Sequence, residues 1–222
     1  WGGMALYIHA RTGADVLGIT LSEEQLKIAR ERAEAAGVAD KVRFELIDYR
    51  ALEGRFDRIV SVGMYEHVGP GHYETFAAKC RALLTEQGAM LLHTIGRMGK
   101  PGRTDAFTDK YIFPGGYIPA LSEAVHASEK MRLIAADVES LRLHYAMTLR
   151  EWYRRCLEHH DEIVALMGER FFRLWTFYLS GSVAAFESGG LCNYQIQYAR
   201  NRRALPLTRG YIEAEERRLL GG

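Results

Sequence analysis

Strand and helix patterns alternate along residues 3–96, and this alternation restricts the fold more than any other feature of the sequence. Four apolar runs typical of strands are separated by helical patterns: strands at 14–20, 41–48, 56–64 and 88–96, helices at 3–11, 22–37 and 71–84. Strands that alternate with helices pair in parallel, because the helices supply right-handed crossovers. The sequence therefore predicts an α/β fold with helices on both faces of a parallel sheet.

The alternation stops after Gly96, where a turn-rich segment predicts an insertion of helix and loop over about 97–135. The remaining patterns predict strands at 132–143 and 192–200 and helices at 145–163, 168–186 and 211–220. A late strand that follows helices is compatible with an antiparallel edge on the sheet. No internal repeat or low-complexity linker is visible, so residues 1–222 are predicted to form one domain.

The first residues are Trp1, Gly2 and Gly3, which run directly into a helical pattern. Two glycines before a helix are typical of the tail of a glycine-rich turn, where the backbone approaches a ligand. Such a turn needs a strand in front of it, and no strand pattern precedes Trp1. We therefore expect the sequence to begin partway through a motif.

Charge and cysteine usage exclude several classes of protein. The net charge is +1, which gives no global field for binding nucleic acid. The basic stretch 200–209 is interpreted as solvated surface, with a patch that binds anionic lipid as the alternative. Cys80, Cys156 and Cys192 are widely spaced, which favours reduced thiols over disulfides and predicts no metal site. No apolar run approaches the ~18 residues of a membrane span. These features predict a cytoplasmic protein.

The residues at the carboxyl ends of the predicted strands are candidates for a binding site, because open parallel sheets bind ligands there. These residues are Thr20, Leu21, Ser22 and Gln25 after the first strand, Asp48, Tyr49 and Arg50 after the second, Tyr65, Glu66 and His67 after the third, and His93 and Ile95 in the fourth. Neighbouring strands lie ~4.8 Å apart, so Glu66 and His93 can reach one small ligand. The structural alternatives stay open: Glu66 as a surface residue or helix cap, and His93 as a histidine of the core. His67 is interpreted as structural.

Five segments together resemble one family: GITLSEEQ, DYRALEGRFDRIVSVGMYEHVG, LLHTIG, KYIFPGGYIP and REWYRRC. They closely resemble the cyclopropane-fatty-acyl-phospholipid synthases, S-adenosylmethionine-dependent enzymes related to the mycolic acid cyclopropane synthases. The likeness runs from Trp1 to about Ile212. It implies a Rossmann-like class I methyltransferase sheet in which the first, central strand and the start of the glycine loop are missing, so that these residues are a fragment of a longer protein.

The resemblance also implies two sets of site residues. The residues that match the binding stretches for S-adenosylmethionine are Trp1, Gly2, Thr20, Leu21, Ser22, Gln25, Tyr49 and Arg50. Within that set, Gly2 is expected to approach the methionine part, and Tyr49 and Arg50 to cover the adenine edge. The residues that match the bicarbonate site are Glu66, His93, the backbone of Ile95, and Tyr145.

The reaction implied by the resemblance is methylene transfer to the cis double bond of an unsaturated phospholipid acyl chain. The double bond takes the sulfonium methyl group, bicarbonate removes a proton from the carbocation, and a cyclopropane ring closes. Tyr65, Tyr111 and Phe113 are candidates for stabilising the cation through their aromatic faces. The substrate implies peripheral association with the inner face of the membrane, and a homodimer stays open.

Two alternatives to the function as a cyclopropane synthase stay open. An enzyme of the same fold could methylate a fatty acyl chain or another small acceptor without closing a ring, and a truncated remnant could bind without catalysis. A dinucleotide dehydrogenase is disfavoured because no GxGxxG follows a strand pattern. A metal enzyme is disfavoured because no His, Cys or Asp cluster has ligand spacing.

Overall fold

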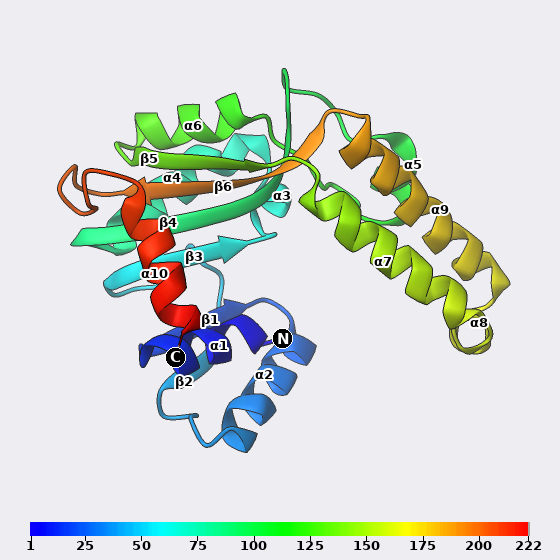
Figure 1. Ribbon diagram of the computed structural model, residues 1–222, viewed down its shortest axis with the longest axis horizontal. Helices are drawn as coiled ribbons and strands as arrows, with labels where there is room; N and C mark the ends of the chain where they lie inside the picture. The colour runs from blue at the N-terminus through cyan, green and yellow to red at the C-terminus, as the bar shows by residue number, and fades with distance from the viewer. Residues whose placement is uncertain (222) are drawn as a thin grey trace. The chain divides into compact units, whose positions relative to one another are not determined.

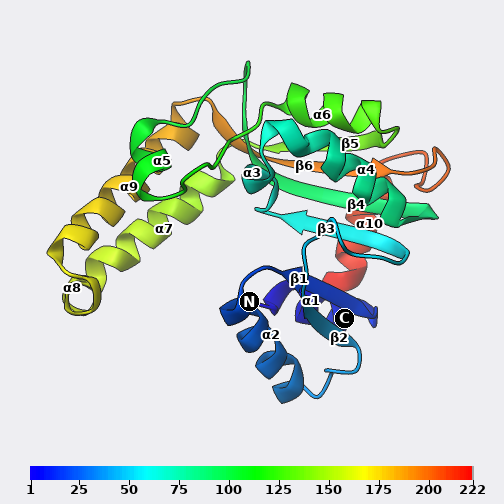
Figure 2. The same cartoon turned by 180° about the vertical axis from the view of Figure 1, so that it is seen from behind.

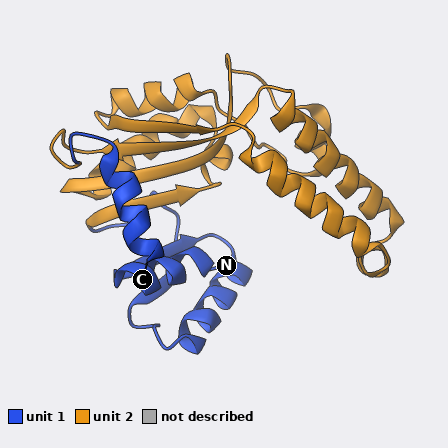
Figure 3. Cartoon of the chain, viewed as in Figure 1, with its two compact units in different colours: residues 1–54, 206–222 blue, residues 55–205 orange. Residues whose placement is uncertain are grey.

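The computed structural model describes residues 1–221, which form two compact units (Figure 3). The first unit comprises residues 1–54 together with the C-terminal segment that begins at Pro206, and the second comprises residues 55–205. Each unit has its own β-sheet.

The first unit is a small α/β structure (Figure 1). Its elements are α1 (Gly3–Thr12), β1 (Val16–Thr20), α2 (Glu23–Ala35), β2 (Val42–Leu46) and α10 (Gly210–Leu220). β1 and β2 pair in parallel, with Val16 opposite Val42 and Thr20 opposite Leu46. Ala29 and Ala33 of α2 pack against the side chains of β2 and form a small core. Parallel pairing through a crossover helix is what the alternating pattern predicts.

Local chemistry determines where the helices of this unit begin. The Ser22 hydroxyl accepts a hydrogen bond from the Gln25 amide at 3.2 Å and caps α2, as the sequence predicts. Gly2 precedes α1 with φ of +83°, and a Cβ at this position would lie 3.1 Å from Ala29 and from the Phe44 ring. Glycine is therefore required at Gly2 by its left-handed conformation and by the packing of α1 against α2 and β2.

The second unit carries a four-stranded sheet in the order β3-β4-β6-β5. Its elements are β3 (Phe56–Val62), α3 (Tyr65–Val68), the 3₁₀ helix η1 (Pro70–His72), α4 (Tyr73–Leu83), β4 (Leu84–Arg97), α5 (Ala106–Tyr111), α6 (Leu121–Lys130), β5 (Ile134–Leu141), α7 (His144–Glu158), α8 (His160–Met167), α9 (Glu169–Glu187) and β6 (Leu191–Ala199). Helices α4 and α6 lie on one face of the sheet, and α7 and α9 pack side by side as a helical hairpin (Figures 1 and 2).

The late strand β6 is antiparallel, but it does not lie at the edge. It pairs antiparallel with β4 on one side and with β5 on the other, so β5 is the edge strand. The predicted position at the edge is therefore wrong. Burial agrees with the interior position, because four successive inward residues of β6 are buried: Cys192, Tyr194, Ile196 and Tyr198. In β5, by contrast, Ile134 and Val138 are exposed.

The strands fall into two sheets where the sequence predicts one. Within residues 1–221, β1 is hydrogen-bonded to β2 alone and β3 to β4 alone. The expected parallel pairing is nevertheless present in both sheets. The sheets and their flanking helices confirm the predicted α/β class.

Some helix boundaries differ from the prediction. The segment predicted as one helix at 145–163 is two, because α7 ends before His159 and α8 begins at His160. The insertion, predicted as a mixture of helix and loop, contains α5 and α6, whose bounds the sequence did not indicate. α6 buries alanines (Ala124 and Ala127), and such small residues give only a weak hydrophobic period.

No helix in residues 1–221 combines the length and apolarity needed to cross a membrane. Cys80 and Cys192 are buried, Cys156 is partly buried, and all three are free thiols. No cluster of His, Cys, Asp and Glu within these residues could hold a metal ion.

Candidate active site

The carboxyl end of β4 presents His93 and Ile95 on the face of the sheet opposite α4 and α6. The alternation of the strand buries Leu92 and Thr94 on the other face and leaves His93 and Ile95 half-buried. Glu66, in the first turn of α3, joins this end of the strand: its Oε1 accepts a hydrogen bond from the Ile95 amide at 2.7 Å. The two candidates that follow neighbouring strands therefore lie at one end of the sheet, as predicted.

The second carboxylate oxygen of Glu66 lies buried with no partner among the described residues. Glu66 as a whole is only 8% exposed. A buried oxygen without a donor costs ~1–3 kcal/mol, so such an atom indicates a ligand or water that donates a hydrogen bond. The hydroxyl of bicarbonate is a donor of that kind, and the residues therefore fit this ion. The Ile95 amide, which the resemblance assigns to bicarbonate, donates to Glu66 in this structure.

His93 and Tyr145 are both held in their uncharged forms. Burial lowers the pKa of His93, although the nearby Glu66 carboxylate partly opposes this shift. Burial also raises the pKa of Tyr145, so its hydroxyl stays protonated and able to donate. The Glu66 charge acts on both groups.

Tyr145 lies in the first turn of α7, and its ring packs edge-on against Phe186 with centroids 5.0 Å apart. Ile95 packs against the same buried cluster of α7 and α9 side chains. Glu66, His93 and Ile95 thus lie together at the end of β4, and the Glu66 charge also acts on Tyr145 of α7. Their catalytic roles stay predictions.

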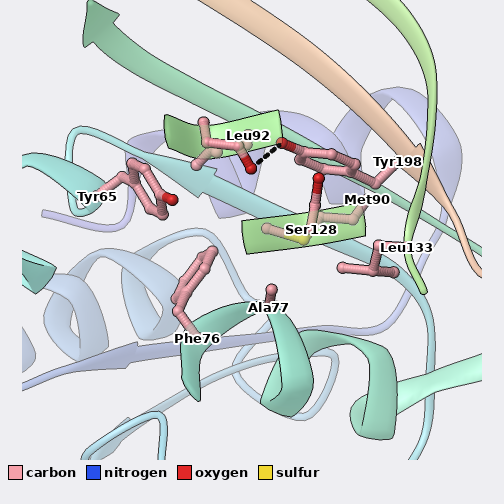
Figure 4. Close-up of a pocket in the computed structure, with 9 residues that line it drawn as sticks. Tyr65, Phe76, Ala77, Met90, Leu92, Ser128, Leu133 and Tyr198 are labelled. Atoms are coloured by element: carbon pink, nitrogen blue, oxygen red, sulfur yellow. Dashed lines mark hydrogen bonds between the residues drawn. The ribbon is translucent and has the colours of Figure 1, made fainter. Parts of the chain in front are cut away.

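Tyr65 does not belong to this group. It is 2% exposed, stacks on Tyr73 with ring centroids 4.1 Å apart, and lines a cavity beneath Met90 and Leu92 (Figure 4). This cavity, on the α4 and α6 face of the sheet, measures about 10 Å³ and has room for a single water at most. Tyr65 is therefore a core residue, and its predicted contact with a cation beside His93 is wrong. Phe113 packs edge-on against His67, with ring centroids 5.8 Å apart, and its role beside a cation stays a prediction.

The predicted cofactor residues all lie in the first unit. The Thr20 hydroxyl donates to Gln25 Oε1 at 2.9 Å and accepts from the Ser22 amide at 3.1 Å, so these three residues form one turn after β1. After β2, a hydrogen-bonded ion pair with Arg50 lowers the pKa of Asp48 to about 2. Trp1 and Leu21 are exposed, Gly2 caps α1, and Tyr49 lies beside Arg50.

A model of the family described as mycolic acid cyclopropane synthetase matches residues 1–196. The chain belongs to this family. A probable fatty acid methyltransferase from Pseudomonas putida is 40% identical over 220 residues, which cover 94% of this chain and 56% of that protein. The cyclopropane-fatty-acyl-phospholipid synthase of Escherichia coli K12 is 39% identical over 200 residues, covering 90% of this chain and 51% of the synthase.

The structure of the cyclopropane synthase MmaA2 from Mycobacterium tuberculosis is similar with a TM-score of 0.84 and 28% identity, over 90% of this chain and 74% of that chain. These comparisons confirm the predicted family and its methyltransferase fold. The chain spans about half the length of the curated relatives it matches.

Asn193 and Gln195 of β6 complete the surroundings of His93, and sequence reasoning missed them. The amide nitrogen of Asn193 lies 3.0 Å from His93 Nε2, and that of Gln195 lies 3.2 Å from Nδ1. A signal was present in the sequence. Polar Asn193, Gln195 and Gln197 alternate with apolar residues, which places three amides on one face of the strand.

The opposite surroundings of two histidines predict opposite titration behaviour. We expect His93 to titrate below the ordinary pKa of 6.5, because burial disfavours its cation. We expect His160, on the exposed hairpin, to titrate above that value because it hydrogen-bonds to Asp161. Histidine-resolved NMR titration, assigned with His93→Gln and His160→Gln, measures both. A higher midpoint for His93 than for His160 would contradict the burial of His93.

Proposed function

We propose that this protein transfers a methylene group from S-adenosylmethionine to the cis double bond of an unsaturated phospholipid acyl chain and forms a cyclopropane ring. The observation that carries the proposal is the Glu66 carboxylate, which is buried at the end of β4 with one oxygen held by the Ile95 amide and the other without a donor. Membership of the cyclopropane synthetase family supports it.

In this proposal S-adenosylmethionine supplies an electrophilic methyl group, and bicarbonate supplies the base that removes a proton. Glu66 Oε2 would accept the hydroxyl hydrogen of bicarbonate and orient the ion, and the protonated Tyr145 hydroxyl would donate to it. His93 stays neutral, so it lines the site without adding a positive charge to it. Buried, oriented groups of this kind typically contribute ~10²–10⁴-fold to the rate of proton transfer.

The turn formed by Thr20, Ser22 and Gln25 is proposed to bind S-adenosylmethionine, together with Trp1, Gly2, Leu21, Tyr49 and Arg50. We expect Thr20→Ala to weaken this binding by ~2–10-fold, because the turn loses two hydrogen bonds that shape it. Isothermal titration calorimetry with the complete gene product measures the affinity. Thr12→Ala, which removes a hydroxyl from the C-terminal end of α1, is the matched control in the same unit. If Thr20→Ala and Thr12→Ala bound S-adenosylmethionine with equal affinity, a binding role for this turn would be excluded.

A second candidate is methylation of a fatty acyl chain without ring closure. It is favoured by the relative from Pseudomonas putida, whose name is probable fatty acid methyltransferase. Deuterium in the transferred methyl group separates ring closure from simple methylation. Ring closure removes one deuteron from that methyl group. A methyl branch formed with loss of a proton from the acyl chain keeps all of its deuterons. Vesicles of unsaturated phospholipid, deuterated S-adenosylmethionine and mass spectrometry of the product provide this test. Mild hydrogenation then distinguishes a ring, which resists it, from an exocyclic methylene group.

The lipid substrate requires contact with a bilayer surface, so we propose peripheral association with the cytoplasmic face of the membrane. We also propose that residues 1–222 belong to a single catalytic domain. Co-sedimentation with unsaturated phospholipid vesicles tests the first of these proposals independently of turnover.

A further inference from the structure

Two amide side chains of β6 contact both ring nitrogens of His93. The distances are 3.0 Å from Asn193 Nδ2 to Nε2 and 3.2 Å from Gln195 Nε2 to Nδ1. Gln195 lies directly opposite His93 in the β4–β6 ladder, and Asn193 lies opposite Ile95. The imidazole is therefore flanked by two amides on the same face of the neighbouring strand.

The chemistry of the ring decides how these amides are oriented. A neutral imidazole has one donor nitrogen and one acceptor nitrogen, so one amide must present its NH₂ group and the other its carbonyl oxygen. Asn193 is buried, and its Oδ1 has no partner among the described residues. If the Asn193 amide were rotated by 180°, its NH₂ group would take the place of the unpaired Oδ1. Two donors without partners would then replace one acceptor without a partner.

Gln195 is only half-buried, so its amide can turn without leaving a fully buried group unpaired. The arrangement with the fewest unpaired buried groups has Asn193 Nδ2–H donating to Nε2. In the same arrangement Nδ1–H of His93 donates to Gln195 Oε1.

We propose that Asn193 and Gln195 are positioning residues that hold His93 as a single neutral tautomer, protonated on Nδ1, with a fixed ring plane next to Glu66. The effect on catalysis rests on the proposed function, whereas the tautomer does not. Because both ring nitrogens are engaged, His93 shapes the site as an oriented neutral group and carries no proton during the reaction.

The charged groups near the ring agree with this assignment. Glu66, from α3, is the carboxylate whose charge acts on His93. On the other side, Glu139 of β5 lies opposite Gln195 and is exposed, so water screens it. The amides that touch the ring carry no charge, and they give no preference to the imidazolium of the kind a carboxylate partner would give.

Nitrogen-15 NMR of the imidazoles in the wild-type protein tests the proposal directly. The His93 resonances are assigned by their loss in His93→Gln. At neutral pH we expect the pattern of an Nδ1–H ring, which is the minor tautomer of free histidine in water. An Nε2–H pattern, or averaging between tautomers, would overturn the proposal. The measurement needs no turnover, so it is independent of whether the protein makes cyclopropane rings.

A matched pair of variants adds a functional readout. We expect Gln195→Leu to shift His93 towards a mixture of tautomers and to lower kcat by ~5-fold with KM unchanged, because one orienting hydrogen bond is lost. Gln197→Leu, which changes the next amide on the same face, opposite Leu91, is expected to leave the His93 spectrum unchanged. An unaltered tautomer in Gln195→Leu would overturn the proposal. If the wild-type spectrum is as expected but no methyl transfer occurs, the proposed function fails and the amide contacts stand.

Discussion

Glu66→Gln is expected to lower the rate of methylene transfer by ~10²–10⁴-fold while leaving the affinity for S-adenosylmethionine unchanged. Oε1 receives the Ile95 amide, and Oε2 is the buried acceptor without a donor. Glutamine keeps the size of the side chain and can keep the Ile95 contact through its carbonyl oxygen. It replaces the second acceptor by an NH₂ group, which meets the hydroxyl of bicarbonate with a donor where an acceptor is required.

The measurement is turnover on vesicles of unsaturated phospholipid by the complete gene product, together with calorimetric titration of S-adenosylmethionine. Glu74→Gln is the matched control, because Glu74 is an exposed residue of α4 whose carboxylate pairs with Lys130 on the surface. That variant should lose little activity, since exposed ion pairs contribute only ~0–1 kcal/mol to stability. Unchanged turnover in Glu66→Gln would reject the assignment of Glu66.

Gly96→Ala is expected to destabilise the protein by ~1–3 kcal/mol, because it overpacks the contact between β4 and β6. A Cβ on Gly96 would lie 2.2 Å from Cδ2 and 2.3 Å from Cε2 of Tyr194, far inside contact distance. The Tyr194 ring is buried, and its hydroxyl donates to the Arg97 carbonyl at 3.0 Å. Moving the ring away would lengthen that hydrogen bond as well.

Chemical denaturation followed by circular dichroism measures the free energy of unfolding. Gly181→Ala is the same substitution at an exposed position inside α9, where the new Cβ meets no atom within 4 Å. We expect it to stabilise the protein by ~0.5–1 kcal/mol, because alanine has a higher helix propensity than glycine. The two variants should therefore change stability in opposite directions. If Gly96→Ala left the free energy of unfolding unchanged, the Tyr194 ring would have to move freely, contrary to its burial.

Local chemistry in the sequence was enough to place most elements and several candidates. The Ser22 cap and the acidic residues that follow it determine where α2 begins. The alternating strands and helices determine the parallel pairs β1–β2 and β3–β4, which place Glu66 and His93 at the same end of one sheet. The motifs around these residues were also sufficient to identify the family, because a motif is read from neighbouring positions in the chain.

Only the tertiary structure decided which residues those candidates touch. The position of β6 between β4 and β5 depends on pairing between distant segments, and hydrophobic periodicity within one segment carries no information about strand order. The same pairing brings Asn193 to His93 across 100 residues of sequence, and the turn into α3 brings Glu66 to the Ile95 amide. Tyr65, adjacent to Glu66 in sequence, points instead into the core beneath α4 and α6. Contacts of this kind form when strands and helices pack together, so the chemistry of the site is a property of the assembled sheet.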